Sequence, residues 1–182
     1  VDASNTTSLG SLAGAVAISK SQDNKAATGV AGAVGVNVDA NPLYEPSLRA
    51  IADTVGGHYV IAAVSDREGE LEMTTAIHPY WNSLRPEGDL YWEQMNHLSQ
   101  GKVRVPAVTV DSLKRRFNLA GPFLIKMDVQ GAEAAVLRGA KETLAETSVI
   151  ICETDLYDFR AIDRLLEEAG FALFDLTEMR RI

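Results

Sequence analysis

The sequence at residues 123–128 is FLIKMD, an apolar run that ends in a carboxylate. Such a run is typical of a strand that is buried on both faces of a parallel sheet. A second run of this kind, SVIICE, occupies residues 148–153. Amphipathic patterns predict helices over residues 132–145 and 158–169, and Gly170 is expected to end the second one. This alternation of strands and helices predicts an α/β fold with a mostly parallel, doubly wound sheet.

The preceding part of the chain continues the same alternation. The further elements that we predict are a helix over residues 46–55, a strand over 59–64 with an antiparallel return over 70–75, an extended segment over 103–110, a helix capped by Asp111 that runs to residue 118, and a last strand over 171–176. Residues 78–101 are aromatic, polar and poorly periodic. Long irregular insertions of this kind are often functional.

The first 38 residues differ from the rest in composition. They are rich in Ala, Gly, Ser and Val and hold only four charged residues, Asp2, Lys20, Asp23 and Lys25. Alternation of branched and small residues over 15–18 and 30–38 predicts two strands, as a hairpin or as a strand–loop–strand, and a small-residue helix over 9–18 is the alternative. We therefore divide the chain into an atypical segment, residues 1–38, which is either the first-strand region of the sheet or a grafted β piece, and a main domain, residues 39–182.

The overall charge excludes some classes of partner. Acidic residues outnumber basic ones by 25 to 17, which gives a formal net charge of -8. This balance argues against a nucleic acid or an anionic membrane as the main partner. No apolar stretch is long enough for a transmembrane helix, no secretory signal is recognisable, and a chain that begins with Val1 can be a piece of a longer one. Cys152, the single cysteine, predicts an inert core thiol and fits a reducing, cytoplasmic compartment.

Three acids follow predicted strands: Asp39, Asp128 and Glu153. Ligands of wound α/β sheets bind outside the carboxyl ends of the strands, so these acids are the candidate site residues. Asp39 can accept two hydrogen bonds from a ribose diol, although it can equally be a turn acid before Asn41. Histidines with metal-ligand spacing are missing, which predicts that there is no metal site.

The block KMDVQGAEAAVLRGA at residues 126–140 resembles the hallmark of FkbM family methyltransferases. Four other segments resemble parts of the same family: VDANP at 38–42, AAVSDREGE at 62–70, VDSL at 110–113 and IICE at 150–153. Together they extend the resemblance over residues 37–176 in the family's order. It implies the Rossmann-like class I methyltransferase fold, S-adenosylmethionine as cofactor, and O-methylation of a hydroxyl on a small molecule or a sugar.

The resemblance also implies roles for individual residues. The cofactor-binding candidates are Asp39, Asn41, Asp2 and Asp128. Independently of the resemblance, transfer to a hydroxyl requires a group that takes its proton, and the candidates for this are Asp128, His78 and Glu153. Lys126 and Glu133 are expected to pair with or orient Asp128, or else to form a structural salt bridge. Gly131 is expected to let the strand turn tightly into the next helix.

The aromatic residues of the 78–101 insertion are candidates for a lid over the substrate, or they simply close the core. These residues are His78, Tyr80, Trp81, Tyr91, Trp92 and His97.

The start of the chain, VDASNTTSLG, keeps an Asp, a Ser and an Asn but lacks the glycine pair of a cofactor-binding turn. A second hypothesis is therefore a non-catalytic, methyltransferase-like protein that acts by association, for example with a second copy through the small-residue strands. A dinucleotide enzyme is less favoured, because no G-x-G-x-x-G opens a helix.

Overall fold

The computed structural model describes residues 15–20, 34–76, 82–85, 99–154, 156–175 and 180–181. Two of the candidate site residues, Asp2 and His78, lie outside the described residues. So do all the aromatic residues of the proposed lid and the cofactor-turn segment VDASNTTSLG.

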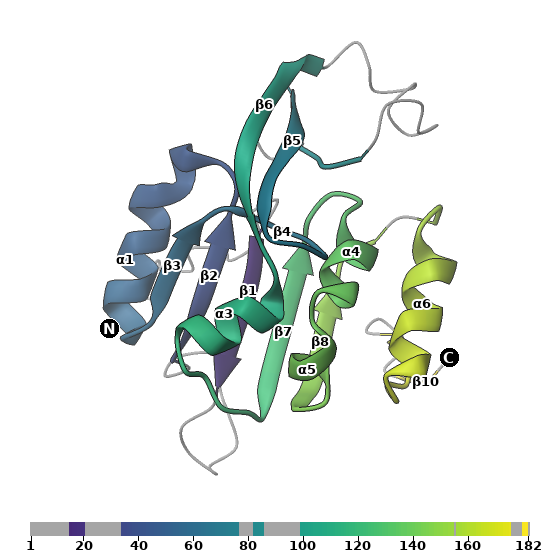
Figure 1. The fold of residues 1–182 in the computed structure, drawn as a ribbon. Helices are drawn as coiled ribbons and strands as arrows, with labels where there is room; N and C mark the ends of the chain where they lie inside the picture. Colours follow the sequence, from purple (N-terminus) through teal and green to yellow (C-terminus); the bar gives the residue numbers. More distant parts are fainter. Residues whose placement is uncertain are drawn as a thin grey trace, which may run out of the picture.

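The main sheet has five strands in the order β3-β2-β1-β7-β8 (Figure 1). Its strands are β1 (Ala15–Lys20), β2 (Val34–Asp39), β3 (His58–Ile61), β7 (Phe123–Asp128) and β8 (Thr147–Cys152). β3 pairs parallel to β2 and β8 pairs parallel to β7, whereas β1 pairs antiparallel to both β2 and β7. Four strands therefore share one direction, and the central strand runs against them.

The arrangement of β1 and β2 decides between the two predictions for the start of the chain. The two strands pair antiparallel, from Val16 with Val38 to Lys20 with Val34, which confirms the prediction of two strands. The alternative helix is wrong for residues 15–18, and its earlier residues lie outside the described part. The predicted α/β fold is confirmed, but with an antiparallel strand at the centre of the sheet.

A second, three-stranded sheet contains β4 (Ala63–Val64), β5 (Gly69–Ala76) and β6 (Ser99–Val108) in the order β4-β6-β5. The predicted strand over 59–64 is split, because its first part pairs in the main sheet and its last two residues pair with β6. The predicted antiparallel return of 70–75 onto 59–64 is wrong, since β6 lies between β4 and β5 and pairs with both. A short hairpin, β9 (Phe174–Asp175) with β10 (Arg180–Arg181), ends the described chain.

The helices are α1 (Glu45–Val55), α3 (Val110–Arg116), α4 (Glu133–Arg138), α5 (Lys141–Leu144) and α6 (Phe159–Glu168), with the 3₁₀ turn η2 (Pro42–Tyr44) before α1. The predicted helix over 132–145 is therefore two short helices. They meet at Gly139, where a Cβ would lie 2.2 Å from the carbonyl oxygen of Ser65. α6 ends as predicted, with Gly170 at φ +87°. No helix in the described residues is long and apolar enough to cross a membrane.

Asp111 does not cap the helix that contains it. Thr109 caps α3, in a reciprocal capping box with Ser112. The Asp111 carboxylate instead accepts hydrogen bonds from the N–H groups of Glu142 and Thr143 in the first turn of α5, at 3.1 and 2.8 Å. Asp111 thus ties α3 to α5.

The main core lies between the five-stranded sheet and α3, α4, α5 and α6. Its most buried members from the sheet include Val36, Val38, Phe123, Ile125 and Met127, and those from the helices include Val110, Leu113, Val136, Leu144 and Ile162. The prediction that residues 148–153 are buried on both faces is wrong, because β8 is an edge strand and its Val149 and Ile151 are 47% and 40% exposed.

Candidate functional site

The strand register brings the predicted acids to one edge of the sheet. Val16 of β1 pairs with Val38 on one side and with Met127 on the other, so the residues that follow, Asp39 and Asp128, lie level with each other. They are two strand spacings apart, which corresponds to about 10 Å between their Cα atoms. Glu153 follows β8 at the same edge, where its N–H donates to the carbonyl of Met127 at 3.1 Å.

Asp39 is almost completely buried, with 1% of its surface exposed. Its Oδ1 accepts a hydrogen bond from the N–H of Asn41 at 2.7 Å, which is the turn interaction expected of an acid in this position. Its Oδ2 is also buried and has no hydrogen-bond partner among the described residues. Burial raises the pKa of Asp39 to about 6, against the opposing effect of the Asn41 hydrogen bond.

The Asn41 side chain contributes to the same turn. It is buried, and its Oδ1 accepts from the N–H of Leu43 at 3.0 Å, which caps η2. Only the amide nitrogen of Asn41 is therefore left to donate to a ligand.

Asp128 lies at the start of a sharply bent loop between β7 and α4. Its Oδ1 accepts from Nε2 of Gln130 at 2.8 Å, and 8% of its surface is exposed. The backbone bends through two successive positive φ angles, +49° at Gln130 and +94° at Gly131. This confirms the expectation that Gly131 allows a tight turn from strand to helix.

Glu133 holds this loop from the helix side. It is 2% exposed, and its Oε1 accepts from the N–H groups of Val129 and Gly131 at 3.3 and 3.1 Å. Burial raises the pKa of Glu133, whereas these hydrogen bonds and the charge of Arg85 lower it. Among the described residues Glu133 therefore binds the backbone of the loop, and the expected pair with Lys126 is not formed.

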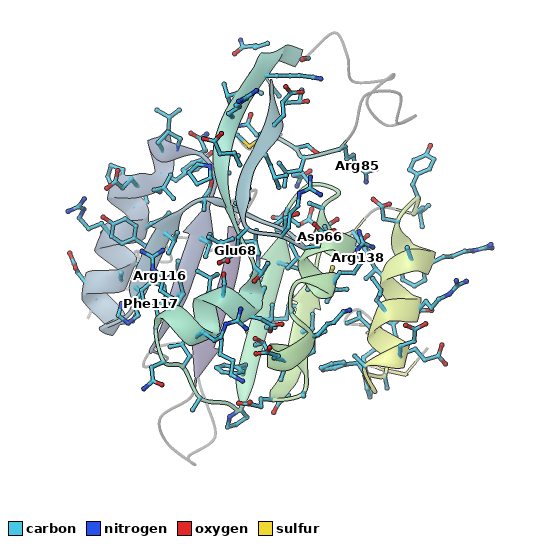
Figure 2. The ribbon with its side chains drawn as sticks, viewed as in Figure 1. Asp66, Glu68, Arg85, Arg116, Phe117 and Arg138 are labelled. Atoms are coloured by element: carbon cyan, nitrogen blue, oxygen red, sulfur yellow. The ribbon has the colours of Figure 1, made fainter. Side chains whose placement is uncertain are left out.

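Arg85 is a member of the site that the sequence patterns did not predict. Its side chain is 4% exposed and forms an ion pair with Asp158, just before α6. Figure 2 shows Arg85 near the loop that joins β7 to α4. The one feature of the sequence that could have drawn attention to Arg85 is that no other Lys or Arg occurs between residues 78 and 101.

The thiol of Cys152 reports the charge of this edge. Burial raises its pKa to about 12, and the negative charges of Glu133, Asp128 and Glu153 add to the effect. A thiol with this pKa stays protonated at neutral pH, which agrees with the predicted inert role. All three carboxylates therefore lie close enough to act on this thiol.

Two pockets among the described residues lie near the sheet and its helices, and neither is lined by an acid that was predicted for the site. One of about 300 Å³ lies among α4, α5 and α6, between residues such as Leu137, Leu144 and Leu165. A much smaller one, about 20 Å³, joins Ala40 after β2 to Ser83 and Val129, so it lies beside the acid edge. Only the position of the smaller pocket is informative, because ligands of such sheets bind at the carboxyl ends of the strands. Within the described ranges no group of three or more His, Cys, Asp or Glu residues could hold a metal ion.

Comparison with known proteins identifies the family. The model of the methyltransferase FkbM domain matches residues 20–173. The chain belongs to the FkbM methyltransferase family. The resemblance predicted over residues 37–176 is thereby confirmed, but its start was placed too late, because the match begins at residue 20. The FkbM match includes Asp39, Arg85, Asp128, Glu133 and Glu153. It begins at the last residue of β1, so most of that strand precedes it. No curated protein and no solved structure matched the chain.

Proposed function

We propose that this chain is an S-adenosylmethionine-dependent methyltransferase that methylates a hydroxyl on a small molecule or a sugar. Membership of the FkbM family supports methyl transfer. The observation that carries the cofactor assignment is the buried Oδ2 of Asp39, which has no hydrogen-bond partner among the described residues.

Asp39 fits the ribose of the cofactor. A carboxylate is a pure acceptor, and a ribose diol offers two hydroxyl donors to it. Asp39 has one oxygen engaged by Asn41 and the other buried without a donor, so a ligand hydroxyl would offset a desolvation cost that the folded protein already bears. The amide nitrogen of Asn41 is a second candidate contact, and Asp2 remains a predicted one.

The acidic edge fits the other end of the cofactor. When bound, S-adenosylmethionine supplies a methyl group on a positively charged sulfonium, and it also carries an ammonium. Carboxylates near these cations are favourable, particularly where water is partly excluded. Asp128 and Glu153 lie at this edge, and Asp128 has Oδ2 left over after Oδ1 binds Gln130.

Transfer to a hydroxyl also requires a group that takes its proton. We favour Asp128 for this role over Glu153, because Asp128 is largely buried and oriented by Gln130 whereas Glu153 is exposed. His78 remains a candidate from the sequence. Beyond this proton transfer, the protein mainly positions the two reactants in line.

We also propose that the sheet is a variant of the Rossmann-like class I methyltransferase fold. The common direction of β2, β3, β7 and β8 supports this, and the antiparallel β1 is the departure from it.

A second candidate function is a non-catalytic protein that acts by association. The favouring observation is that most of β1 precedes the family match and that this strand runs antiparallel in the middle of the sheet.

Titration calorimetry with S-adenosylhomocysteine tests the proposal and separates the two candidates. We expect the chain to bind with a micromolar dissociation constant. Asp39→Asn keeps the oxygen that accepts from Asn41 but replaces the unpartnered oxygen, so its dissociation constant should be at least tenfold larger. Asp53→Asn, at an exposed acid on α1, is the matched control and should bind normally. No heat at millimolar ligand would reject the cofactor assignment and favour the non-catalytic protein.

A further inference from the structure

Arg85 is buried beside the bend of the β7–α4 loop. An added Cβ on Gly131 would lie 1.8 Å from Nε and 2.5 Å from Cζ of Arg85, so the guanidinium lies directly against the glycine backbone. Burying a guanidinium is costly unless negative charge compensates it. Asp158 supplies this charge through the ion pair, and the Arg85 charge acts in turn on buried Glu133.

The segment that contains Arg85 also binds the loop through Ser83. The Ser83 hydroxyl donates to the carbonyl of Gln130 at 2.5 Å and accepts from the N–H of Arg85 at 3.1 Å. Ser83 is itself held by a β-bridge to Thr74 of β5. The loop is therefore fixed from one side by Ser83 and Arg85, and from the other side by Glu133.

We infer that Arg85 is a positioning residue that holds the Val129–Glu133 backbone, and through it Asp128, in the arrangement that cofactor binding requires. The link to Asp128 is Gln130, whose carbonyl is bound by Ser83 and whose amide orients the Asp128 carboxylate. Small displacements of a positioned group cost a large part of its effect, so loosening the loop should weaken the site without removing any group that touches the ligand.

The first test needs no ligand. Hydrogen exchange of the full chain should show the amides of Val129 and Gly131 exchanging about tenfold faster in Arg85→Ala, because their acceptor, Glu133, loses its compensating charge. Arg49→Ala is the matched control, since Arg49 also pairs with a carboxylate but its side chain is 59% exposed. Unchanged exchange over residues 128–133 in Arg85→Ala would overturn the inference.

The second test rests on the proposed function. S-adenosylhomocysteine should bind about tenfold more weakly to Arg85→Ala, and millimolar methylguanidinium should restore part of this affinity. Loosening of the fold elsewhere would not respond to a guanidinium that binds at the vacated position. Arg85→Lys should be intermediate, since it keeps the charge but loses the planar group that lies on Gly131. Arg85→Ala that binds like the wild type would overturn the inference.

Two further comparisons keep the outcomes separate. Asp158→Asn keeps an acceptor for Arg85 but removes the charge, and it is the variant to use if Arg85→Ala does not fold. Its amides at Val129 and Gly131 should exchange faster and its affinity for S-adenosylhomocysteine should fall, each by less than is expected for Arg85→Ala. Equal values for Asp158→Asn, Arg85→Lys and the wild type would then overturn the inference. If the wild type does not bind S-adenosylhomocysteine, the proposed function fails, while the exchange experiment still tests whether Arg85 holds the loop.

Discussion

Asp39 ends β2 and Glu133 begins α4, so both lie near the carboxyl ends of the main sheet's strands. Both carboxylates are buried, yet their surroundings differ. Asp39 has one backbone hydrogen bond and an oxygen with no partner among the described residues. Glu133 accepts two backbone hydrogen bonds with one oxygen, and these bonds and the charge of Arg85 oppose the burial that raises its pKa. The difference distinguishes a group that is available to a ligand from one that maintains the scaffold. Equal burial alone would not have separated them.

The scaffold side should be the more sensitive to change, and Gly131→Ala should have the largest effect. The new Cβ meets the Arg85 guanidinium and requires a strained backbone at φ +94°. We expect the free energy of unfolding to fall by roughly 3 kcal/mol or more in urea denaturation. Gly56→Ala, at φ +69° with nothing within 4 Å of the added Cβ, carries strain alone and should lose about 1 kcal/mol. Equal losses at the two sites would mean that Arg85 moves aside without cost.

Glu133→Leu tests the scaffold carboxylate directly. It leaves the N–H groups of Val129 and Gly131 without their acceptor, so we expect a loss of about 2–3 kcal/mol. Glu133→Gln keeps the acceptor and should stay within about 1 kcal/mol of the wild type. If Asp39→Asn proved as destabilising as Glu133→Leu in the same denaturation series, Asp39 would be part of the scaffold as well.

The sequence predicted the parts of this edge that depend on local pattern. The apolar run ending at Asp128, the acid at the end of β2 and the glycine that ends α6 all follow from neighbours in the chain. Asp39 and Asp128 come to one edge because β2 and β7 run in the same direction. Their roles in binding and catalysis stay predictions.

The features that the sequence did not predict depend on distant partners. Arg85 and Asp158 are 73 positions apart, so no local spacing reveals the pair. Asp111 binds the start of α5, about 30 residues further on, in place of its own helix. The exposed face of β8 depends on its place at the sheet edge, which the apolar run SVIICE cannot encode.

The pH dependence of stability should single out Asp39. Its pKa is about 6 in the folded protein against an ordinary value of 3.8, so the folded state holds this proton more tightly than the unfolded state. The contribution of Asp39 to stability is therefore fully present below pH 4 and is lost as pH rises through 6, by about 2–3 kcal/mol in total.

Asp39→Asn lacks this titration, so subtracting its unfolding free energy from that of the wild type at each pH isolates the effect. The raised pKa of Glu133 is common to both proteins and cancels. A difference that does not change between pH 4 and pH 7.5 would show that Asp39 is not a desolvated carboxylate. Saturating S-adenosylhomocysteine should reduce the loss of stability of the wild type relative to Asp39→Asn at pH 7.5, because the ligand would supply hydrogen-bond donors to the ionised Asp39.

The smallest expected effect is on the reactivity of the Cys152 thiol, which lies near Glu133, Asp128 and Glu153. With a pKa of about 12, Cys152 should react with an aromatic disulfide at pH 8 at least a hundredfold more slowly in the folded protein than in urea. Glu133→Gln removes one of the negative charges that raise this pKa, so it should speed the reaction a few-fold. Burial, the larger cause, is left in place. Asp39→Asn should leave the rate unchanged, since Asp39 is not among the charges that act on the thiol. An equal acceleration by both variants would indicate general loosening of the fold, and would remove the electrostatic distinction between the two carboxylates.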